Sequence, residues 1–184
     1  VSAYIKPAYK ITATPDKNTL FAGDTVTFKV KAEFFNGTPV TNTSLSYSAY
    51  GASGTNSQGS INLSSQGEGS FTVTPKYTND QTYWPSYLSV DVKPSKAEEG
   101  QIETNSSVFV FGPHINNSIN QKQSTSNVTF TVKTRAVVLN NNSRGEPYWN
   151  TEEYLGGPVV GASTKVDISE VVYLKDQTGT GYDP

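Results

Sequence analysis

The chain has 184 residues, 34% of them hydrophobic and 16% charged, with a net charge of −2 and no cysteine. This composition excludes a disordered chain, and its scattered charges exclude a clustered basic surface for nucleic acid. The absence of cysteine excludes a disulfide framework, a thiolate metal site and a cysteine nucleophile. No apolar run is long enough to span a membrane, and the Thr- and Asn-rich composition predicts an extracytoplasmic location.

Strand patterns separated by turn signals fill the first part of the chain. In residues 25–34, TVTFKVKAEF, apolar and polar side chains alternate, which is typical of a strand with one buried face. Ala22-Gly23-Asp24 predicts a tight turn before this strand, and Gly112-Pro113 predicts the end of the unit, because proline cannot donate to a ladder. The predicted strands are residues 8–14, 25–35, 44–50, 59–64, 69–75, 86–93 and 106–111.

The second part of the chain repeats signals of the first. VTFKVKA at 26–32 returns as VTFTVKT at 128–134, 102 residues later. A Gly-X-Pro-Val turn follows each strand, at 37–40 and at 156–159, with 17 additional residues before the second turn. Two further matches extend the correspondence: the alternating run at 45–50 is followed in the second copy by one at 165–168, and the glycine-rich turn at 66–69 returns at 178–181. We interpret the chain as a tandem repeat.

The repeat predicts an all-β protein of two immunoglobulin-like β-sandwiches. The first domain is residues 1–112, with about seven strands. The second is residues 113–184, with an inserted loop at about 140–155. This second copy stops soon after its glycine-rich turn, where the first copy continues for two or three more strands. We therefore expect an incomplete second sandwich and a chain that is a piece of a longer protein with further modules.

Two aromatic loops are the candidate binding sites. Planar rings suit protein hot spots or the faces of sugars, and loops carry function more often than strands do. The alternative is that each ring folds back and covers the end of its own sandwich. The candidate residues are Tyr83, Trp84, Tyr87, Tyr148, Trp149 and Tyr154.

The chain shows no arrangement typical of an enzyme. His114 is the only histidine, and its place in the Gly112-Pro113-His114 turn predicts a solvated linker residue. The paired carboxylates at 98–99 and 152–153 are sequence neighbours, whereas glycosidase chemistry needs two carboxylates across a cleft. We expect no catalytic residue, no metal site and no cofactor.

Several motifs follow one recognisable pattern. They are KPAYKI at 6–11, TPDK at 14–17, FAGDTV at 21–26, FFNGTPV at 34–40, GPVVGA at 157–162 and GTGYD at 179–183. This pattern resembles the macroglobulin-like domains of the alpha-2-macroglobulin family, which open on a pDK-x-x-Y-x-x-GD-x-V run and continue with a G-x-PV hairpin. Phe21 stands where the family more often has tyrosine.

The resemblance implies a bacterial protease-trapping protein, an endopeptidase inhibitor, built from many such sandwiches. Since the chain has no cysteine, it cannot hold the thioester found in many members. It would serve as a non-catalytic scaffold, with neighbouring modules of the same protein and proteases as its partners. The alternative is a cell-surface adhesin or carbohydrate-binding module, in which Trp84 or Trp149 stacks on sugar rings.

Overall fold

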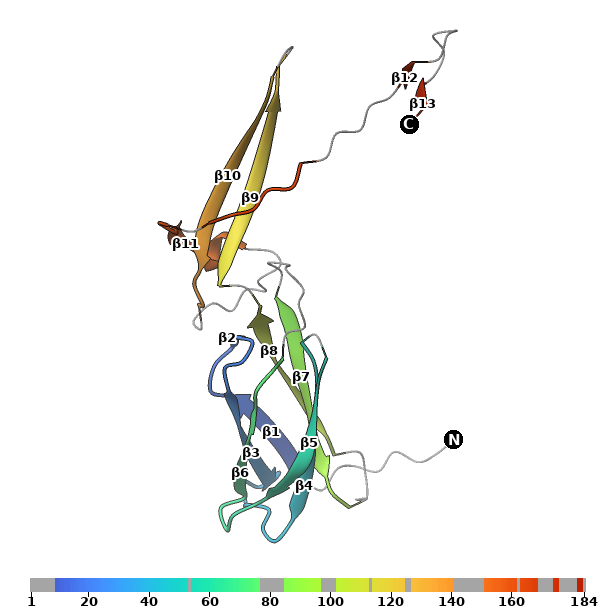
Figure 1. Ribbon diagram of the computed structural model, residues 1–184. Coiled ribbons are helices and arrows are strands. Elements are labelled where there is room, and N and C mark those ends of the chain that lie inside the picture. The colour runs from blue at the N-terminus through green and yellow to red at the C-terminus, as the bar shows by residue number, and fades with distance from the viewer. Residues whose placement is uncertain are drawn as a thin grey trace.

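The computed structural model describes residues 9–52, 54–76, 85–96, 102–112, 114–124, 127–140, 151–161, 163–168, 174–175 and 182–183. These residues form an all-β protein with one short 3-10 helix and no α-helix (Figure 1). The first half contains β1 (Tyr9–Pro15), β2 (Thr19–Phe21), β3 (Val26–Phe34), β4 (Ser44–Gly51), β5 (Thr55–Asn62), β6 (Glu68–Val73), β7 (Ser86–Pro94) and β8 (Thr104–Phe111). The second half contains β9 (Ile115–Gln123), β10 (Val128–Val137), η1 (Thr151–Tyr154), β11 (Leu155–Pro158), β12 (Leu174–Lys175) and β13 (Tyr182–Asp183).

The first half is a two-layer sandwich. One sheet has the order β1-β3-β6, and the other has the order β2-β8-β7-β4-β5. Alternate side chains of each strand point into the space between the layers. β3 contributes Val26, Phe28, Val30 and Ala32 to this core, and all four are fully or almost fully buried. Figure 1 shows the two layers facing each other.

Most of the predicted strands of the first half are confirmed within a few residues. The alternation of 25–34 corresponds to β3, although Phe34 at its end is exposed and packs its ring edge-on against Tyr9. The predicted turn is also present: Gly23 has φ +93°, and Asp24 N–H donates to the carbonyl of Phe21 at 3.1 Å. β2 was not predicted, because a run of three residues is too short to show a period. It pairs in parallel with β8.

The described residues of the second half form a three-stranded sheet, β11-β10-β9, and a small pair, β12-β13. β9 and β10 make a long antiparallel hairpin that extends away from the sandwich (Figure 1). No second layer covers this sheet among the described elements, so the predicted second sandwich is seen here as a single sheet. The alternating run at 165–168 does not form a strand: residues 163–168 have no strand structure, and Ile168 is 66% exposed. An alternating apolar and polar sequence forms a strand only where a neighbouring strand is available to pair with its backbone.

The two halves share the geometry that follows the repeated strand. Pro39 bridges to Glu33 of β3, and Pro158 pairs with Arg135, which occupies the equivalent position of β10. The next residue repeats its hydrogen bond as well. Val40 N–H donates to Ala32 at 3.0 Å, and Val159 N–H donates to Thr134, the counterpart of Ala32, at 3.1 Å. The two Gly-X-Pro-Val segments therefore pair with equivalent edges of β3 and β10. The predicted turn at 178–181 lies outside the described residues.

Candidate functional site

An aromatic cluster lies where the sandwich meets the β9–β10 hairpin. β8, β10 and η1 end at Phe111, Val137 and Tyr154 respectively. These three side chains form a small buried cluster that is separate from the core of the sandwich. Three partly buried side chains pack against it, namely Phe21, Phe109 and Leu139. We call this set the aromatic junction. It joins residues that are widely separated in sequence, so burial of apolar surface links the two halves.

The start of the junction is positioned by the parallel pairing of β2 with β8. This pairing places Phe21 opposite Phe111, and the next amide, Ala22 N–H, donates to the Phe111 carbonyl at 2.9 Å. His114 then stacks its ring on Phe21, with centroids 3.9 Å apart and planes 27° apart. Its carbonyl accepts the Val137 N–H at 2.8 Å. His114 is exposed, as expected of a linker residue, but its ring and carbonyl both hold the turn in place.

Tyr154 is a packing residue rather than an exposed contact residue. Its side chain is 1% exposed, and its ring centroid lies 5.2 Å from that of Phe111. Its carbonyl accepts the Val138 N–H at 2.9 Å, which holds η1 against the end of β10. The expected exposed role of Tyr154 is therefore corrected: its ring is buried and packs on Phe111 of the first unit as well as on Val137 of β10. A ring that becomes buried on folding stabilises the protein because its apolar surface leaves water, whereas a ring that stays exposed in a loop does not.

Tyr87 is the other candidate that the structure describes. It lies on β7, is 38% exposed, and packs its ring against Phe109 with centroids 4.6 Å apart. Tyr87 therefore lies beside the junction and presents part of its ring to solvent. The remaining candidates, Tyr83, Trp84, Tyr148 and Trp149, lie outside the described residues. Of the six, the structure describes Tyr87, which contacts Phe109, and Tyr154, which contacts Phe111.

Arg135 fastens β11 and η1 to β10 through three groups. Its Nε donates to the Gly156 carbonyl at 2.9 Å, and its Nη2 donates to the Leu155 carbonyl at 2.8 Å. Its Nη1 forms an ion pair with Glu152 at 2.8 Å. A guanidinium suits this task because its donors are held in a fixed plane. The strand β11 is short, so these side-chain hydrogen bonds supplement a small ladder.

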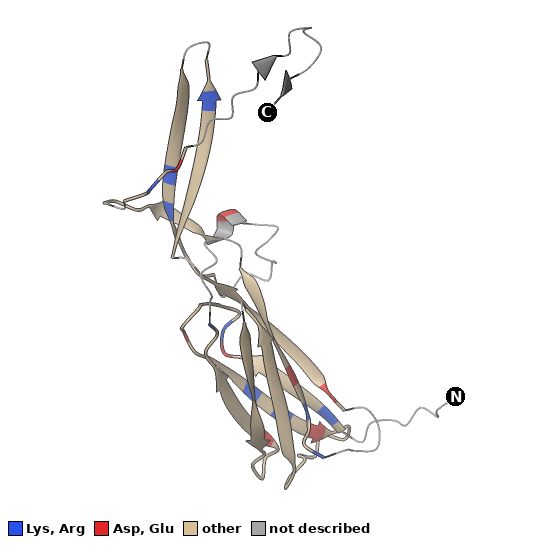
Figure 2. Cartoon of the chain, turned by 45° about the vertical axis from the view of Figure 1, so that its right-hand side comes forward, with Lys and Arg blue, Asp and Glu red and all other residues tan. Residues whose placement is uncertain are grey.

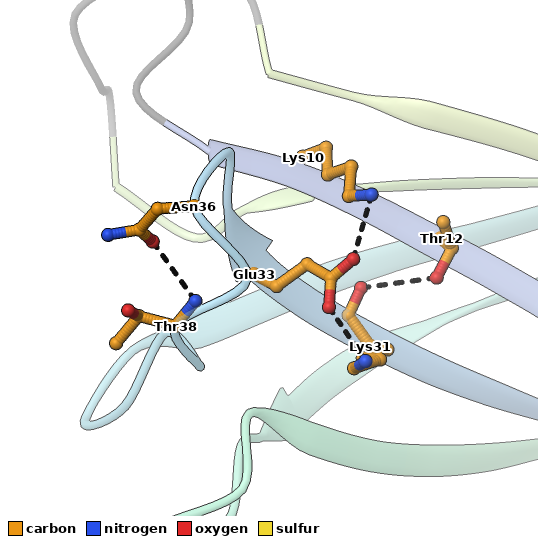
Figure 3. Close-up of polar contacts among 6 residues, drawn as sticks. All are labelled: Lys10, Thr12, Lys31, Glu33, Asn36 and Thr38. Carbon is orange, nitrogen blue, oxygen red and sulfur yellow. Dashed lines mark hydrogen bonds and ion pairs between the residues drawn. The ribbon is translucent and has the colours of Figure 1, made fainter.

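A second charged cluster lies at the far end of the sandwich (Figure 3). Glu33 of β3 accepts Lys10 of β1 at 2.8 Å and Lys31 of its own strand at 2.7 Å. These hydrogen bonds from Lys10 and Lys31 lower the pKa of the Glu33 carboxyl to about 2. Glu33 and Arg135 are equivalent positions of the repeat. In each half, therefore, a charged residue pairs with the proline of the Gly-X-Pro-Val segment: Glu33 with Pro39, and Arg135 with Pro158.

The junction's chemistry is that of packing, since its side chains are aromatic and aliphatic. Sequence reasoning did not assign Phe21, Phe111 or Val137 to it. The available signal was the Phe109-Val110-Phe111 run, in which both faces of a terminal strand are apolar, so one face must pack outside the sandwich. In the described residues, no group of three His, Cys, Asp or Glu side chains is placed to hold a metal ion. The same part of the chain contains no helix with the length and hydropathy of a membrane crossing.

Comparison with known proteins identifies no family for this chain. No family model matches the chain, and no curated protein matches it. Among solved structures, the crystal structure of Spo0M, a sporulation control protein from Bacillus subtilis, superposes with a TM-score of 0.36 at 10% sequence identity. The superposition covers 71% of this chain and 68% of that chain. An overlap this loose assigns neither a common fold nor a function.

Proposed function

We propose that this chain is a non-catalytic structural part of a larger extracytoplasmic protein, in which the aromatic junction holds a β-sandwich and the following β-sheet in a fixed relation. The observation that carries the proposal is the burial of Tyr154 against Phe111 and Val137. Large apolar side chains that pack between two units restrict their relative motion more than a polar linker does. A scaffold needs such a restriction, because its work is to hold modules in place.

The repeated geometry of β3 and β10 supports the same proposal. Glu33 with Pro39 and Arg135 with Pro158 make equivalent pairs, as do Val40 and Val159 with their acceptors. Duplicated modules that meet through a short connection are typical of proteins that extend by addition of units.

In its finer form, the proposal places the chain in the body of an alpha-2-macroglobulin-like protease trap. The support is the resemblance of the motifs at 14–17 and 21–26, whose residues have structural roles. Asp16 and Thr27 exchange two hydrogen bonds, because Asp16 N–H donates to the Thr27 carbonyl at 2.9 Å and Thr27 N–H donates to Asp16 Oδ1 at 3.0 Å. Gly23 and Asp24 form the turn before β3. These residues shape a β-sandwich, and the protease-trapping role rests on the resemblance.

The structural proposal is tested by measuring the distance between the two halves. The chain has no cysteine, so Ser60→Cys on β5 and Ser118→Cys on β9 give two unique, exposed sites for spin labels. Pulsed electron spin resonance should return one narrow distance distribution. Tyr154→Ala should broaden it, because removal of a large buried ring costs about 3–5 kcal/mol of packing. Tyr154→Phe, which keeps the ring, is the matched control and should leave the distribution narrow.

A broad distribution in the unmodified protein would contradict the scaffold proposal. The finer assignment has a separate test: the full-length protein that contains this chain should retain an added endopeptidase in gel filtration. Binding of a defined glycan that is abolished by Trp149→Ala would instead favour the adhesin, and would remove the scaffold role as the main function.

A further inference from the structure

Over residues 128–133, one edge of β10 has no strand beside it in the described part of the protein. β9 lies along the whole of the other edge, and β11 covers this edge only from Arg135 to Val137. The carbonyl of Thr134 receives Val159 N–H at this edge. Since alternate residues of a strand direct their backbone groups to the same side, the N–H and C=O groups of Val128, Phe130 and Val132 point to this edge too.

The equivalent edge of β3 is occupied. β6 pairs with it in antiparallel register, with Phe71 opposite Phe28 and Val73 opposite Val26. The rings of Phe28 and Phe71 stack with centroids 5.2 Å apart. The same strand sequence therefore has a partner strand in the first half, whereas in the second half its counterpart presents an open edge.

The open edge continues an interface that is already formed. In the first half, both the Gly-X-Pro-Val segment and the residue just before β6 form hydrogen bonds with the backbone of Ala32. Val40 N–H donates to the Ala32 carbonyl, and Ala32 N–H donates to the Gly67 carbonyl. In the second half, Val159 makes the first of these hydrogen bonds, to the carbonyl of Thr134. A strand added beside Val128–Lys133 would extend the ladder from that point, as β6 does on β3.

The apolar face of this hairpin is also partly exposed, with Phe130 and Val132 half-buried and Thr164 in contact with Thr134 on the same face. Val128 is 46% exposed, whereas its counterpart Val26 is 0% exposed. On the neighbouring strand, Ile119, which pairs with Val132, is 55% exposed. An apolar stripe that runs beside an unpaired edge is a binding surface for an extended polypeptide with apolar residues at alternate positions.

Charge indicates the chemistry of that polypeptide. All the charged residues of β9 and β10 are basic, namely Lys122, Lys133 and Arg135 (Figure 2). Arg135 is neutralised by Glu152. Lys133 corresponds to Lys31 of β3, which has Glu68 of β6 directly opposite. In the first half, an acidic residue of the added strand thus faces this lysine.

We propose that the Val128–Lys133 edge of β10 binds an extended strand of a partner polypeptide in antiparallel register. The strand carries an acidic residue opposite Lys133, a small residue opposite Val132, an aromatic residue opposite Phe130 and a branched apolar residue opposite Val128. This is the pattern that β6 presents to β3. The inference does not rest on the protease-trap assignment, because it follows from the open edge and charge of β10 and from the pairing of β6 with the equivalent strand β3.

The probe is a synthetic peptide, QGEGSFTVTP, which has the sequence of residues 66–75. It is added to the intact protein, and amide hydrogen exchange is followed by NMR. Saturating peptide should slow exchange at Val128, Phe130 and Val132 at least tenfold. Exchange at these three amides distinguishes binding at β10 from replacement of β6 in the first half.

Charge reversal provides the second readout, because Lys133 is exposed and its replacement leaves the packing intact. Lys133→Glu should weaken peptide binding roughly five- to tenfold, and a peptide with lysine in place of its single glutamate should restore the affinity. Lys122→Glu, on the same hairpin but away from the edge, is the control and should have little effect.

Three results would overturn the inference. The first is unchanged exchange at all three amides with saturating peptide. The second is a dimer in sedimentation that protects the same amides without any peptide, since the occupant would then be a second copy of this chain. An effect of Lys122→Glu equal to that of Lys133→Glu would show non-specific attraction of an acidic peptide, which also contradicts the register.

Discussion

Single side chains set how each end of the molecule is held. At the far end of the sandwich, Glu33 joins β1 to β3 by accepting Lys10 and Lys31 together. At the junction, Arg135 serves the equivalent position with the opposite charge and with backbone carbonyls as its main acceptors. Glu33 of β3 and Arg135 of β10 therefore both hold a neighbouring segment against their strand. Glu33 does so by ion pairs with lysines, and Arg135 mainly by hydrogen bonds to backbone carbonyls.

The lowered pKa of Glu33 predicts a pH-dependent contribution to stability. Its ordinary pKa of 4.5 falls to about 2 in the folded protein, because Lys10 and Lys31 stabilise the carboxylate. The folded state thus gains stability from this group above pH 4.5 and loses it as the pH falls toward 2. Glu33→Gln should reduce the decline in the free energy of unfolding over this range, as measured by urea denaturation at a series of pH values.

Replacement of both ammonium groups tests the cause. The double variant Lys10→Gln/Lys31→Gln should show the same reduced dependence with Glu33 still present, because the carboxyl would then titrate at its ordinary pKa. If the free energy of unfolding declines equally at low pH in the unmodified protein, in Glu33→Gln and in the double variant, protonation of Glu33 is not coupled to folding.

At the scale of elements, β3 and β10 show how one strand sequence is used twice. VTFKVK and VTFTVK both form strands, both pair with an antiparallel neighbour, and both receive a returning Gly-X-Pro-Val segment. They differ in what lies over the apolar face. Val26 is covered by the five-stranded sheet, whereas Val128 is not covered by any described element.

The short strand β11 should depend on the Arg135 side chain. Arg135→Lys keeps the charge but cannot reproduce three directed hydrogen bonds, and hydrogen bonds of charged groups contribute roughly 1.5–3 kcal/mol each when well formed. We expect hydrogen exchange to become about tenfold faster at Val159 N–H and Val138 N–H, whose acceptors are Thr134 and Tyr154.

The first half supplies the internal reference for that measurement. Val40 N–H, which makes the equivalent hydrogen bond to Ala32, should exchange at an unchanged rate. Equal acceleration at Val40 and Val159 would mean that the substitution weakens the whole protein, and unchanged exchange at Val159 would mean that the ladder alone holds β11.

At the scale of the whole molecule, a two-layer sandwich with an extensive core is joined to a hairpin that stands beyond it (Figure 1). The large core and the small junction cluster predict unequal stability. Lys29 and Thr131 are equivalent residues of β3 and β10, each paired with the antiparallel neighbour strand. Thr131 N–H should exchange at least tenfold faster than Lys29 N–H, because a hairpin with one exposed apolar face opens locally.

The denaturant dependence of that exchange separates local from global opening. Exchange at Lys29 should accelerate steeply with low concentrations of urea, as expected for unfolding of the sandwich, whereas exchange at Thr131 should respond weakly. Equal rates with equal dependence would mean that the two halves unfold as one cooperative unit.

The strands and turns of the first half could be predicted from the sequence because their signals are local. The alternation in 25–34 and the Gly23 turn report backbone preferences that hold wherever the chain is folded. The site was less predictable. Tyr154 lies in an apparent loop, and its burial depends on Phe111 and Val137, which come from other elements. Its own sequence neighbourhood carries no sign of those partners.

The amino-acid sequence by itself determined an all-β chain, the order of its main strands and the repeated strand with its returning proline. Tertiary structure alone decided which copy of that strand is buried, which aromatic rings form the junction and which edge of β10 stays open. The physical reason is range: alternation and turn chemistry act over a few residues, whereas burial requires a second layer whose residues come from distant parts of the chain.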